Sequence, residues 1–390
     1  MDRMYEKVAS VGLDVHYKFS QATMRDAAGR VVRRERLEHE DREQLRDRLG
    51  RWPQGVLVVM EASFGWGWLS DEMLAAGLEV GLSNCYKLEQ MRKARGLAKT
   101  NAKDADLLSL LPFERTDWWK VWRSPPVVRD RREWMRYRAG LVAVGTATQC
   151  RIRAIFHRHG IFPNIGRLYG GQGRRFLAEL CRDGRTEQVQ LWDGALANLR
   201  GQVRLLNHLR RQQAEVERRL HRQLEQSPLV RRLDGVPGFG LILSHTVISE
   251  IGQIDRFRDH RSLASYSLLA PISRETGEAE PEKVPLGRHL GFRGNLTLKW
   301  TFIEAARGAV RKGGRWRAMF EAYTDGGKRH RNRGYIKVAR ALVKVIYAMW
   351  RDGTEYSDTP PVRPGSRRRR REGRTRSGTG QLSQPMAAGR

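Results

Sequence analysis

The stretch VLVVME at residues 56–61 decides the fold, because it is a short, continuous apolar run that ends on a charged residue. Such a run is typical of a strand buried inside a sheet whose faces are covered by helices. Glu61 then stands at the end of that strand. A carboxylate there would be costly to desolvate without a partner, so we expect other polar groups close to it.

The segments on either side of this run extend it into a domain. Before it, three strands form a meander and a polar helix follows; after it, helices and strands alternate. We predict strands at residues 8–15, 19–25, 31–37, 56–61 and 79–84, the last as an edge strand. We predict helices at residues 42–49, 64–77 and 101–111. This order predicts an α/β domain with a mixed sheet of about five strands.

The rest of the chain is mostly helical. Two long basic helical patterns, at 129–160 and 186–226, predict a helical hairpin or coiled-coil arm, which either packs within one chain or joins two chains. A second compact unit follows, and the chain ends in a Pro, Ser and Gly-rich segment with five successive arginines, which we expect to be disordered. The expected divisions are an α/β domain at 1–115, a basic connector at 116–230, a mostly α unit at 231–350 and a basic tail at 351–390.

The charge of the chain favours nucleic acid as its partner. Its 390 residues include 73 Lys and Arg against 43 Asp and Glu, a formal net charge of +30, and the excess is spread along the chain. No apolar run approaches the roughly 18 residues that a membrane-spanning helix needs, and the first residues lack the apolar core of a signal peptide. The three cysteines form no C-x-x-C pair, so we expect no disulfide and no zinc site, as in a cytoplasmic protein. Because the chain lacks a long apolar run, we also expect no membrane partner.

Three carboxylates are candidates for chemistry. Asp14 ends the first predicted strand, Glu61 ends the buried strand, and Asp104 lies on the following helix with Asn101 one turn before it. Strand ends in open α/β sheets deliver side chains to one rim, where ligands bind. Together these oxygen ligands suit a hard cation such as Mg²⁺. Taken singly, each residue also fits the role of an ordinary turn, strand-end or helix-surface residue.

The motifs around these residues resemble a known family. The elements GLDV at 12–15, VMEAS at 59–63 and KTNAKDADLLSLL at 99–111 are similar to the DEDD motifs of the IS110 and IS1111 insertion-sequence transposases, which include the Piv-type invertases. The likeness continues through LDGVPGFG, ETGE and GNLTLKWTFIEAA, up to about residue 350. It implies an RNase H-like, RuvC-like first domain, a helical connector, and a mostly α C-terminal domain with a nucleophilic serine. It also implies DNA transposition guided by a structured RNA, and a role for Asp14, Glu61 and Asp104 in binding Mg²⁺ or Mn²⁺.

Two positions depart from the family pattern. Asn101 stands where the pattern has a first aspartate on the helix, and an amide oxygen coordinates a metal without contributing charge. Asp106 is expected to point to a different face, so it is a poor substitute. In APISRETGE the pattern has a serine before the glycine, and this chain has Thr276. Thr276 is the candidate nucleophile, with Ser273 as a second candidate; an ordinary turn threonine is the alternative.

Several basic or glycine-rich segments are candidates for contact with nucleic acid. The loop GVPGFG resembles a helix-hairpin-helix, whose backbone amides bind phosphate, or is a tight turn that needs glycine. Basic residues in CRIRAIFHRHGI and GGKRHRNRG suit phosphate contact, although a solvated surface accounts for them too. The candidate contacts are Arg151, Arg153, Arg158, Gly238, Gly240, Lys328, Arg329, Arg331 and Arg333. Trp118, Trp119 and Trp122 either stack on unpaired bases or clamp a linker to a domain.

The sequence therefore favours an enzyme that cuts and joins DNA strands in insertion-sequence transposition. The expected partners are DNA, a structured guide RNA and further copies of the same chain in a dimer or tetramer, because strand exchange needs several nicks held together. One alternative is a RuvC-like nuclease that only hydrolyses, in which Thr276 has no role. A second is a nucleic-acid-binding relative with impaired catalysis.

Overall fold

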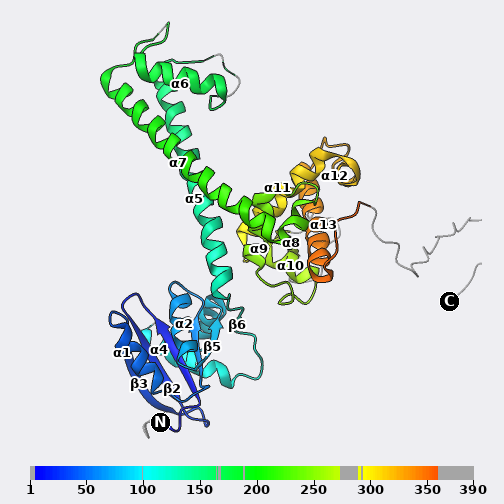
Figure 1. Cartoon of the computed structure of the whole chain (residues 1–390). Coiled ribbons are helices and arrows are strands. Elements are labelled where there is room, and N and C mark those ends of the chain that lie inside the picture. Colours follow the sequence, from blue (N-terminus) through cyan, green and yellow to red (C-terminus); the bar gives the residue numbers. More distant parts are fainter. Residues whose placement is uncertain are drawn as a thin grey trace, which may run out of the picture.

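The computed structural model describes residues 5–98, 100–163, 165, 168–187, 189–272, 289–290 and 293–358. These residues form an α/β domain, a long helical hairpin and a helical C-terminal unit (Figure 1). Within the described residues, no helix is both long and apolar enough to cross a membrane.

The α/β domain is built on one mixed sheet of six strands in the order β3-β2-β1-β4-β5-β6. β1 is antiparallel to β2 and parallel to β4, β5 is parallel to β4, and β6 is antiparallel to β5. The strands are β1 (Ser10–Val15), β2 (Phe19–Arg25), β3 (Val31–Glu38), β4 (Leu57–Glu61), β5 (Glu79–Ser83) and β6 (Lys120–Val121). The prediction that residues 79–84 form an edge strand was wrong, because β6 covers the outer side of β5. At two residues, β6 is too short to leave a periodic signal.

Helices cover both faces of this sheet. On one face, α1 and α2 pack against alternate residues of β1 and β4, such as Leu13 and Met60. On the other face, α3 and α4 pack against Val59. The helices are α1 (Arg42–Gly50), α2 (Trp66–Ala75), α3 (Cys85–Ala94) and α4 (Asn101–Leu110). The sequence pattern did not predict α3, although Asn84 caps its N-terminus by accepting hydrogen bonds from two backbone amides and Arg92 and Lys93 occupy its last turn.

Helix and sheet approach each other very closely at Gly12 in β1. A Cβ atom there would lie 2.1 Å from the carbonyl oxygen of Ala105 and 2.1 Å from the amide nitrogen of Ser109, both in α4. Two residues back along β1, the hydroxyl of Ser10 donates to the carbonyl oxygen of Ser109 at 2.9 Å. The helix thus runs antiparallel to β1, and its first turn lies at the end of the strand where Asp14 stands.

The connector is a helical hairpin formed by α5 (Pro126–Arg158) and α7 (Asp193–Gln226), with α6 (Gly171–Asp183) near its tip (Figure 1). Apolar residues of the two long helices, including Ile152, Leu199 and Leu206, pack against each other. The two long helices thus pack against each other within one chain. The helix α6 was not predicted.

Among its described residues, the C-terminal unit packs six helices around one apolar core. They are α8 (Pro228–Asp234), α9 (Leu241–Ile251), α10 (His260–Tyr266), α11 (Leu296–Lys312), α12 (Gly314–Thr324) and α13 (Arg331–Asp352). Two short paired strands, β7 (Pro271–Ile272) and β8 (His289–Leu290), lie between α10 and α11. After α13, the hydroxyl of Tyr356 accepts a hydrogen bond from the indole of Trp316 at 3.0 Å, so this unit extends past residue 350. Residues 359–390 lie outside the described part.

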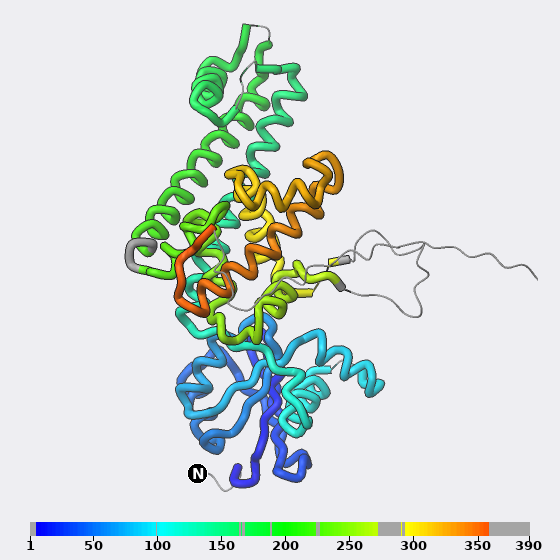
Figure 2. The backbone as a smooth tube through the Cα atoms, turned by 90° about the vertical axis from the view of Figure 1, so that its right-hand side faces the viewer, coloured from blue at the N-terminus to red at the C-terminus, as the bar shows by residue number. Residues whose placement is uncertain are grey.

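The C-terminal unit sits beside the α/β domain, at the base of α5 (Figure 2). The guanidinium of Arg132 in α5 donates to the backbone carbonyls of Ser249 and Glu250 in α9, each at 2.9 Å. The ring of Trp122 fills the space beside Gly252, where a Cβ would lie 2.4 Å from it. Trp119 is buried in the α/β core. Trp122 therefore packs at the junction of the two units, and Trp119 packs within the α/β domain against Gly81.

We expect Gly12→Ala to destabilise the α/β domain strongly, because its new methyl group would meet backbone atoms of α4 that cannot move aside as a side chain would. The expected loss is about 3 kcal/mol or more in the free energy of unfolding, measured by chemical denaturation. Gly50→Ala is the matched control: it lies at the end of α1 with nothing within 4 Å of its added Cβ. Equal stability of the two variants would contradict the close contact at Gly12.

Candidate active site

The strand-end carboxylates of β1 and β4 point to the same face of the sheet. Side chains alternate along a strand, so Asp14 shares the face of Gly12, which contacts α4. By the same rule, Glu61 shares the face of Val59, which packs among α3 and α4. The two strands are parallel neighbours, and the residues just before these carboxylates pair directly. Asp14 and Glu61 therefore lie at one edge and on one face, as the sequence predicted.

Asp104 reaches the same edge from α4. It precedes Ala105, the residue that contacts Gly12, and its side chain is only 14% exposed. Thr100 caps the helix by accepting a hydrogen bond from the amide of Lys103 at 3.3 Å. A carboxylate in the first turn is also favoured by the helix dipole. Asn101, the first residue of α4, is exposed at this end.

Basic groups accompany two of these carboxylates. Nε2 of His16 lies 3.0 Å from Oδ2 of Asp14, and Nε of Arg92 lies 3.9 Å from Oδ1 of Asp104. Both Arg92 and Asp104 are largely buried, so their attraction is screened less than that of a surface pair. The positive charge of Arg92 reduces the repulsion between carboxylates at this edge of the sheet.

Glu61 lies beside the thiol of Cys85, the first residue of α3. Burial and the nearby negative charge of Glu61 raise the pKa of the Cys85 thiol, which keeps it protonated at neutral pH. Within the described residues, no three or more His, Cys, Asp or Glu side chains are gathered closely enough to hold a metal ion. The carboxylate oxygens of Asp14, Glu61 and Asp104 are the type of ligand that a hard cation prefers, and in this structure each of the three lies beside a protein neighbour.

Asp106 is directed away from this group, toward β2 and β3. Its carboxylate accepts hydrogen bonds from Thr23 at 2.8 Å and from Arg34 at 2.9 and 3.2 Å. Burial alone would raise the pKa of Asp106, but the bonds from Arg34 and Thr23 outweigh it and hold the pKa below its ordinary value. The expectation that Asp106 points to a different face is confirmed.

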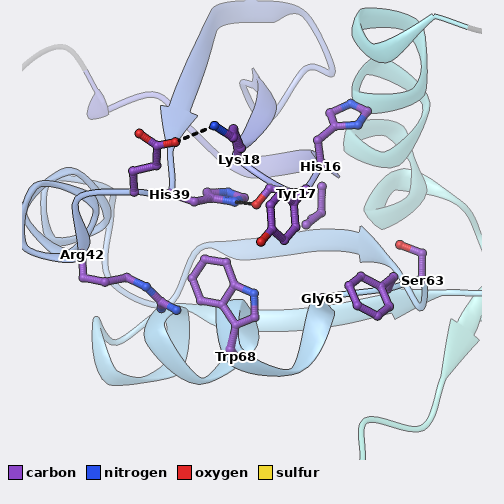
Figure 3. Close-up of a pocket in the computed structure, with 11 residues that line it drawn as sticks. His16, Tyr17, Lys18, His39, Arg42, Ser63, Gly65 and Trp68 are labelled. Carbon is purple, nitrogen blue, oxygen red and sulfur yellow. Dashed lines mark hydrogen bonds and ion pairs between the residues drawn. The ribbon is translucent and has the colours of Figure 1, made fainter.

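A cavity of about 880 Å³ opens beyond the ends of β1 and β4, on the α1 and α2 side of the sheet, and neither Asp14 nor Glu61 is among its lining residues (Figure 3). Its walls come from the turn after β1, the segment after β3 and the segment after β4. They consist of Val15, His16, Tyr17, Lys18, His39, Glu40, Arg42, Ser63, Phe64, Gly65 and Trp68. Sequence reasoning missed this cavity, because it depends on how three separate loops meet.

The C-terminal unit touches the α/β domain close to the carboxylates. The guanidinium carbon of Arg293, just before α11, lies 3.1 Å from the centre of the Tyr86 ring in α3. Tyr86 follows Cys85, the neighbour of Glu61. Both candidate nucleophiles, Thr276 and Ser273, lie outside the described residues, between the paired strands β7 and β8.

The predicted basic contacts form two exposed groups away from the carboxylate edge (Figure 1). One group lies near the tip of the hairpin, at the end of α5. Because an α-helix rises about 1.5 Å per residue, the 33 residues of α5 place this end about 50 Å from the end that lies at the α/β domain. The other group lies where α12 is joined to α13. The first comprises Arg151, Arg153 and Arg158, and the second Lys328, Arg329, Arg331 and Arg333.

The two predicted loop glycines have different surroundings. Gly238 has a φ of 89°, and a Cβ there would lie 2.0 Å from the carbonyl oxygen of Ala305 in α11. Close packing against α11 thus accounts for glycine at this position. Gly240 is the N-cap of α9 and has nothing within 4 Å of an added Cβ. Of the two, only Gly240 leaves space for a phosphate at the helix N-terminus.

Comparisons with known proteins match most of these elements. Residues 11–163 match a family model described as a transposase of the DEDD IS110 type, and residues 230–321 match the Transposase IS116/IS110/IS902 family. Together the two models cover more than half of the chain.

Three relatives show the same likeness. An IS116 uncharacterized 44.8 kDa protein of Streptomyces clavuligerus is 24% identical over 312 residues, which cover 69% of this chain and 75% of the relative. An IS110 uncharacterized 43.6 kDa protein of Streptomyces coelicolor is 24% identical over 319 residues, covering 68% and 74%. The transposase for IS1111A of Coxiella burnetii is 28% identical over 127 residues, covering 30% and 32%.

Alanine substitutions at the two loop glycines separate packing from phosphate binding. We expect Gly238→Ala to lower the free energy of unfolding by about 2–3 kcal/mol through its clash with α11. Gly240→Ala should leave stability nearly unchanged, so any loss of DNA affinity in that variant reports on the loop itself. Thermal denaturation and DNA-binding titration measure the two effects. A stable Gly238→Ala variant would contradict the packing role.

Proposed function

This chain belongs to the IS110 family of DEDD transposases and is a DNA transposase, and we propose that it cuts and joins DNA by combining a metal-dependent carboxylate site with a hydroxyl group from its C-terminal unit. The family supports insertion-sequence transposition, and the DEDD match supports an RNase H-like fold for the α/β domain. The observation that carries the proposed mechanism is the shared face and edge of Asp14, Glu61 and Asp104.

We assign the metal ligands to Asp14, Glu61 and Asp104, with the side-chain oxygen of Asn101 as a neutral fourth. A bound Mg²⁺ or Mn²⁺ would polarise the phosphodiester and stabilise the charge that develops on its oxygens. Three carboxylates supply the negative charge that such a cation needs, and the amide supplies none, so affinity should be lower than with four carboxylates.

The neighbouring residues orient these ligands. Nε2 of His16 contacts Oδ2 of Asp14 and would limit the rotation of this carboxylate. Arg92 lies beside Asp104 and offsets the repulsion among three negative charges before a cation arrives. The close packing of α4 on Gly12 keeps Asp104 at a fixed position along β1. Orienting groups of this kind preserve a site's geometry between turnovers.

Thr276 is the proposed nucleophile. Its hydroxyl oxygen would attack the phosphorus atom, its proton would pass to a base or to solvent, and the sugar oxygen would leave with the electrons of the broken bond. A second sugar hydroxyl would then attack the same phosphorus and release the threonine, which joins the strands without net hydrolysis. The contact of Arg293 with Tyr86 supports this division of labour, because it brings the chain that follows β8 onto the carboxylate domain.

Nucleic acid would be held over a wide surface. The net charge of +30 and the exposed arginines of the hairpin suit a structured RNA and DNA bound together, since each neutralised phosphate releases counterions. The glycine loop before α9, as a helix-hairpin-helix-like element, would add backbone contacts to phosphate. We propose a homo-oligomer, because strand exchange requires several cuts in one assembly.

The proposal is tested by incubating the purified protein with DNA carrying the element ends, RNA from the flanking non-coding sequence, and Mg²⁺. The expected products are joined DNA strands and a protein-linked DNA band, both lost in Asp14→Ala. Asp106→Asn is the matched control, since it removes a carboxylate from the same helix that faces elsewhere. It should retain most of the joining activity. If a structured RNA guides the reaction, the joined products should be lost when the RNA is omitted.

Variants of Thr276 decide between strand joining and simple hydrolysis. Thr276→Ser should maintain or raise joining, and Thr276→Val should abolish the protein-linked band. Unchanged joining in the Val variant would transfer the role to Ser273. Hydrolysis without a linked band would favour the RuvC-like nuclease. DNA binding without any strand breakage, unchanged in Asp14→Ala, would contradict both enzymatic functions.

A further inference from the structure

Two aromatic residues next to the carboxylates are almost fully exposed. Tyr17, three residues after Asp14, has 86% of its surface exposed, and Phe64, three residues after Glu61, has 91%. Exposed apolar side chains that are gathered at one place, rather than scattered singly, mark candidate binding surfaces. Each follows the end of a strand that carries a carboxylate, and both line the cavity at that edge.

The other walls of this cavity combine flat rings with positive charge. Trp68 meets the imidazole of His39 edge-on at 5.0 Å, and the guanidinium of Arg42 lies 3.7 Å from the Trp68 ring (Figure 3). Burial lowers the pKa of His39, which keeps this ring neutral. Lys18 pairs with Glu40 at 3.0 Å, but both side chains are about two-thirds exposed or more, so a phosphate can compete for the lysine.

We propose that this cavity receives one unpaired base of the DNA strand that is being cut, stacked on Tyr17 and Phe64. The inference rests on the proposed function, because Tyr17 and Phe64 follow Asp14 and Glu61 by three residues, a chain distance of at most about 11 Å from a phosphate bound there. Exposed aromatic rings beside Lys and Arg are the usual surface for unpaired bases. The cavity volume of about 880 Å³ lies within the range of about 300–1,000 Å³ that is typical of small-ligand sites, and is ample for one nucleotide.

This base-binding cavity would help to place the phosphodiester bond. Removing a base from its stack in a duplex costs free energy that stacking on protein rings returns. The nucleotide next to the cut would then be held between the segment after β1 and the segment after β4, beyond the carboxylates. Tyr17 and Phe64 are thus positioning residues for the strand, not participants in the bond changes.

The test uses the full-length protein and a forked DNA duplex with 2-aminopurine as the first unpaired base, because the fluorescence of this base is quenched when it stacks on an aromatic ring. We expect the wild-type protein to quench the probe. Tyr17→Ala and Phe64→Ala should each reduce the quenching and weaken binding of the fork by about tenfold. Tyr17→Phe and Phe64→Tyr keep the rings and should retain the quenching.

The matched control is Phe113→Ala, an exposed aromatic of the same domain that does not line the cavity. The Phe113→Ala variant should quench the fluorescence of the probe as strongly as the wild-type protein does. Quenching that is absent in the wild type, or unchanged in both alanine variants, would overturn the proposal. So would quenching of a 2-aminopurine RNA fork with none of the DNA fork, because the cavity would then hold RNA.

The same measurement separates this inference from the proposed catalysis. Asp14→Asn should still quench the DNA probe, since it keeps the rings and removes only the metal-binding charge. If the wild-type protein quenches the probe but cuts no DNA, the proposed function is refuted and the proposal of a base-binding cavity is supported. Strand joining that proceeds normally in the Tyr17→Ala, Phe64→Ala double variant, with no loss of fork affinity, would refute the cavity's role and leave the catalytic proposal intact.

Discussion

Helix α4 lies against β1 at Gly12 with backbone touching backbone, and the position of Asp104 depends on this contact. A side chain at residue 12 would push the helix outward, because the atoms it would meet are the carbonyl of Ala105 and the amide of Ser109. The helix also runs antiparallel to β1, so its first turn and the end of the strand coincide. The geometry of the carboxylate edge therefore follows from two features: the absence of a side chain at Gly12, and the alternation of side chains along two parallel strands.

The sequence predicted the carboxylate edge better than its surroundings. Strand β4 and its terminal Glu61 were predicted because a short apolar run with one charge at its end is typical of a buried strand that reaches the rim of its sheet. The helix α3 was missed because it is polar, and β6 because it has two residues. The relation of Asp104 to Asp14 required the contact at Gly12, which no periodicity reveals. The exposure of Tyr17 and Phe64 depends on where three loops meet, so the cavity could only be found in three dimensions.

The C-terminal unit is attached to the α/β domain by a few specific contacts. Arg132 binds two carbonyls at the end of α9, Trp122 packs against Gly252, and Arg293 covers Tyr86. These contacts involve backbone groups and ring faces, which carry no pairing signal in a sequence. They place the unit that contains Thr276 beside the domain that contains the carboxylates. The proposed mechanism, which combines a hydroxyl from one unit with carboxylates from the other, requires such a junction.

The central claim is that Asp14, Glu61 and Asp104 act as one cation site. Titration of the purified protein with Mn²⁺, followed by the electron paramagnetic resonance signal of the free ion, tests this without any DNA. We expect saturable binding that weakens by about tenfold or more in each of Asp14→Asn, Glu61→Gln and Asp104→Asn. Asp106→Asn should bind like the wild type. Binding that none of the three substitutions weakens, or that Asp106→Asn weakens as much as they do, would contradict a shared site.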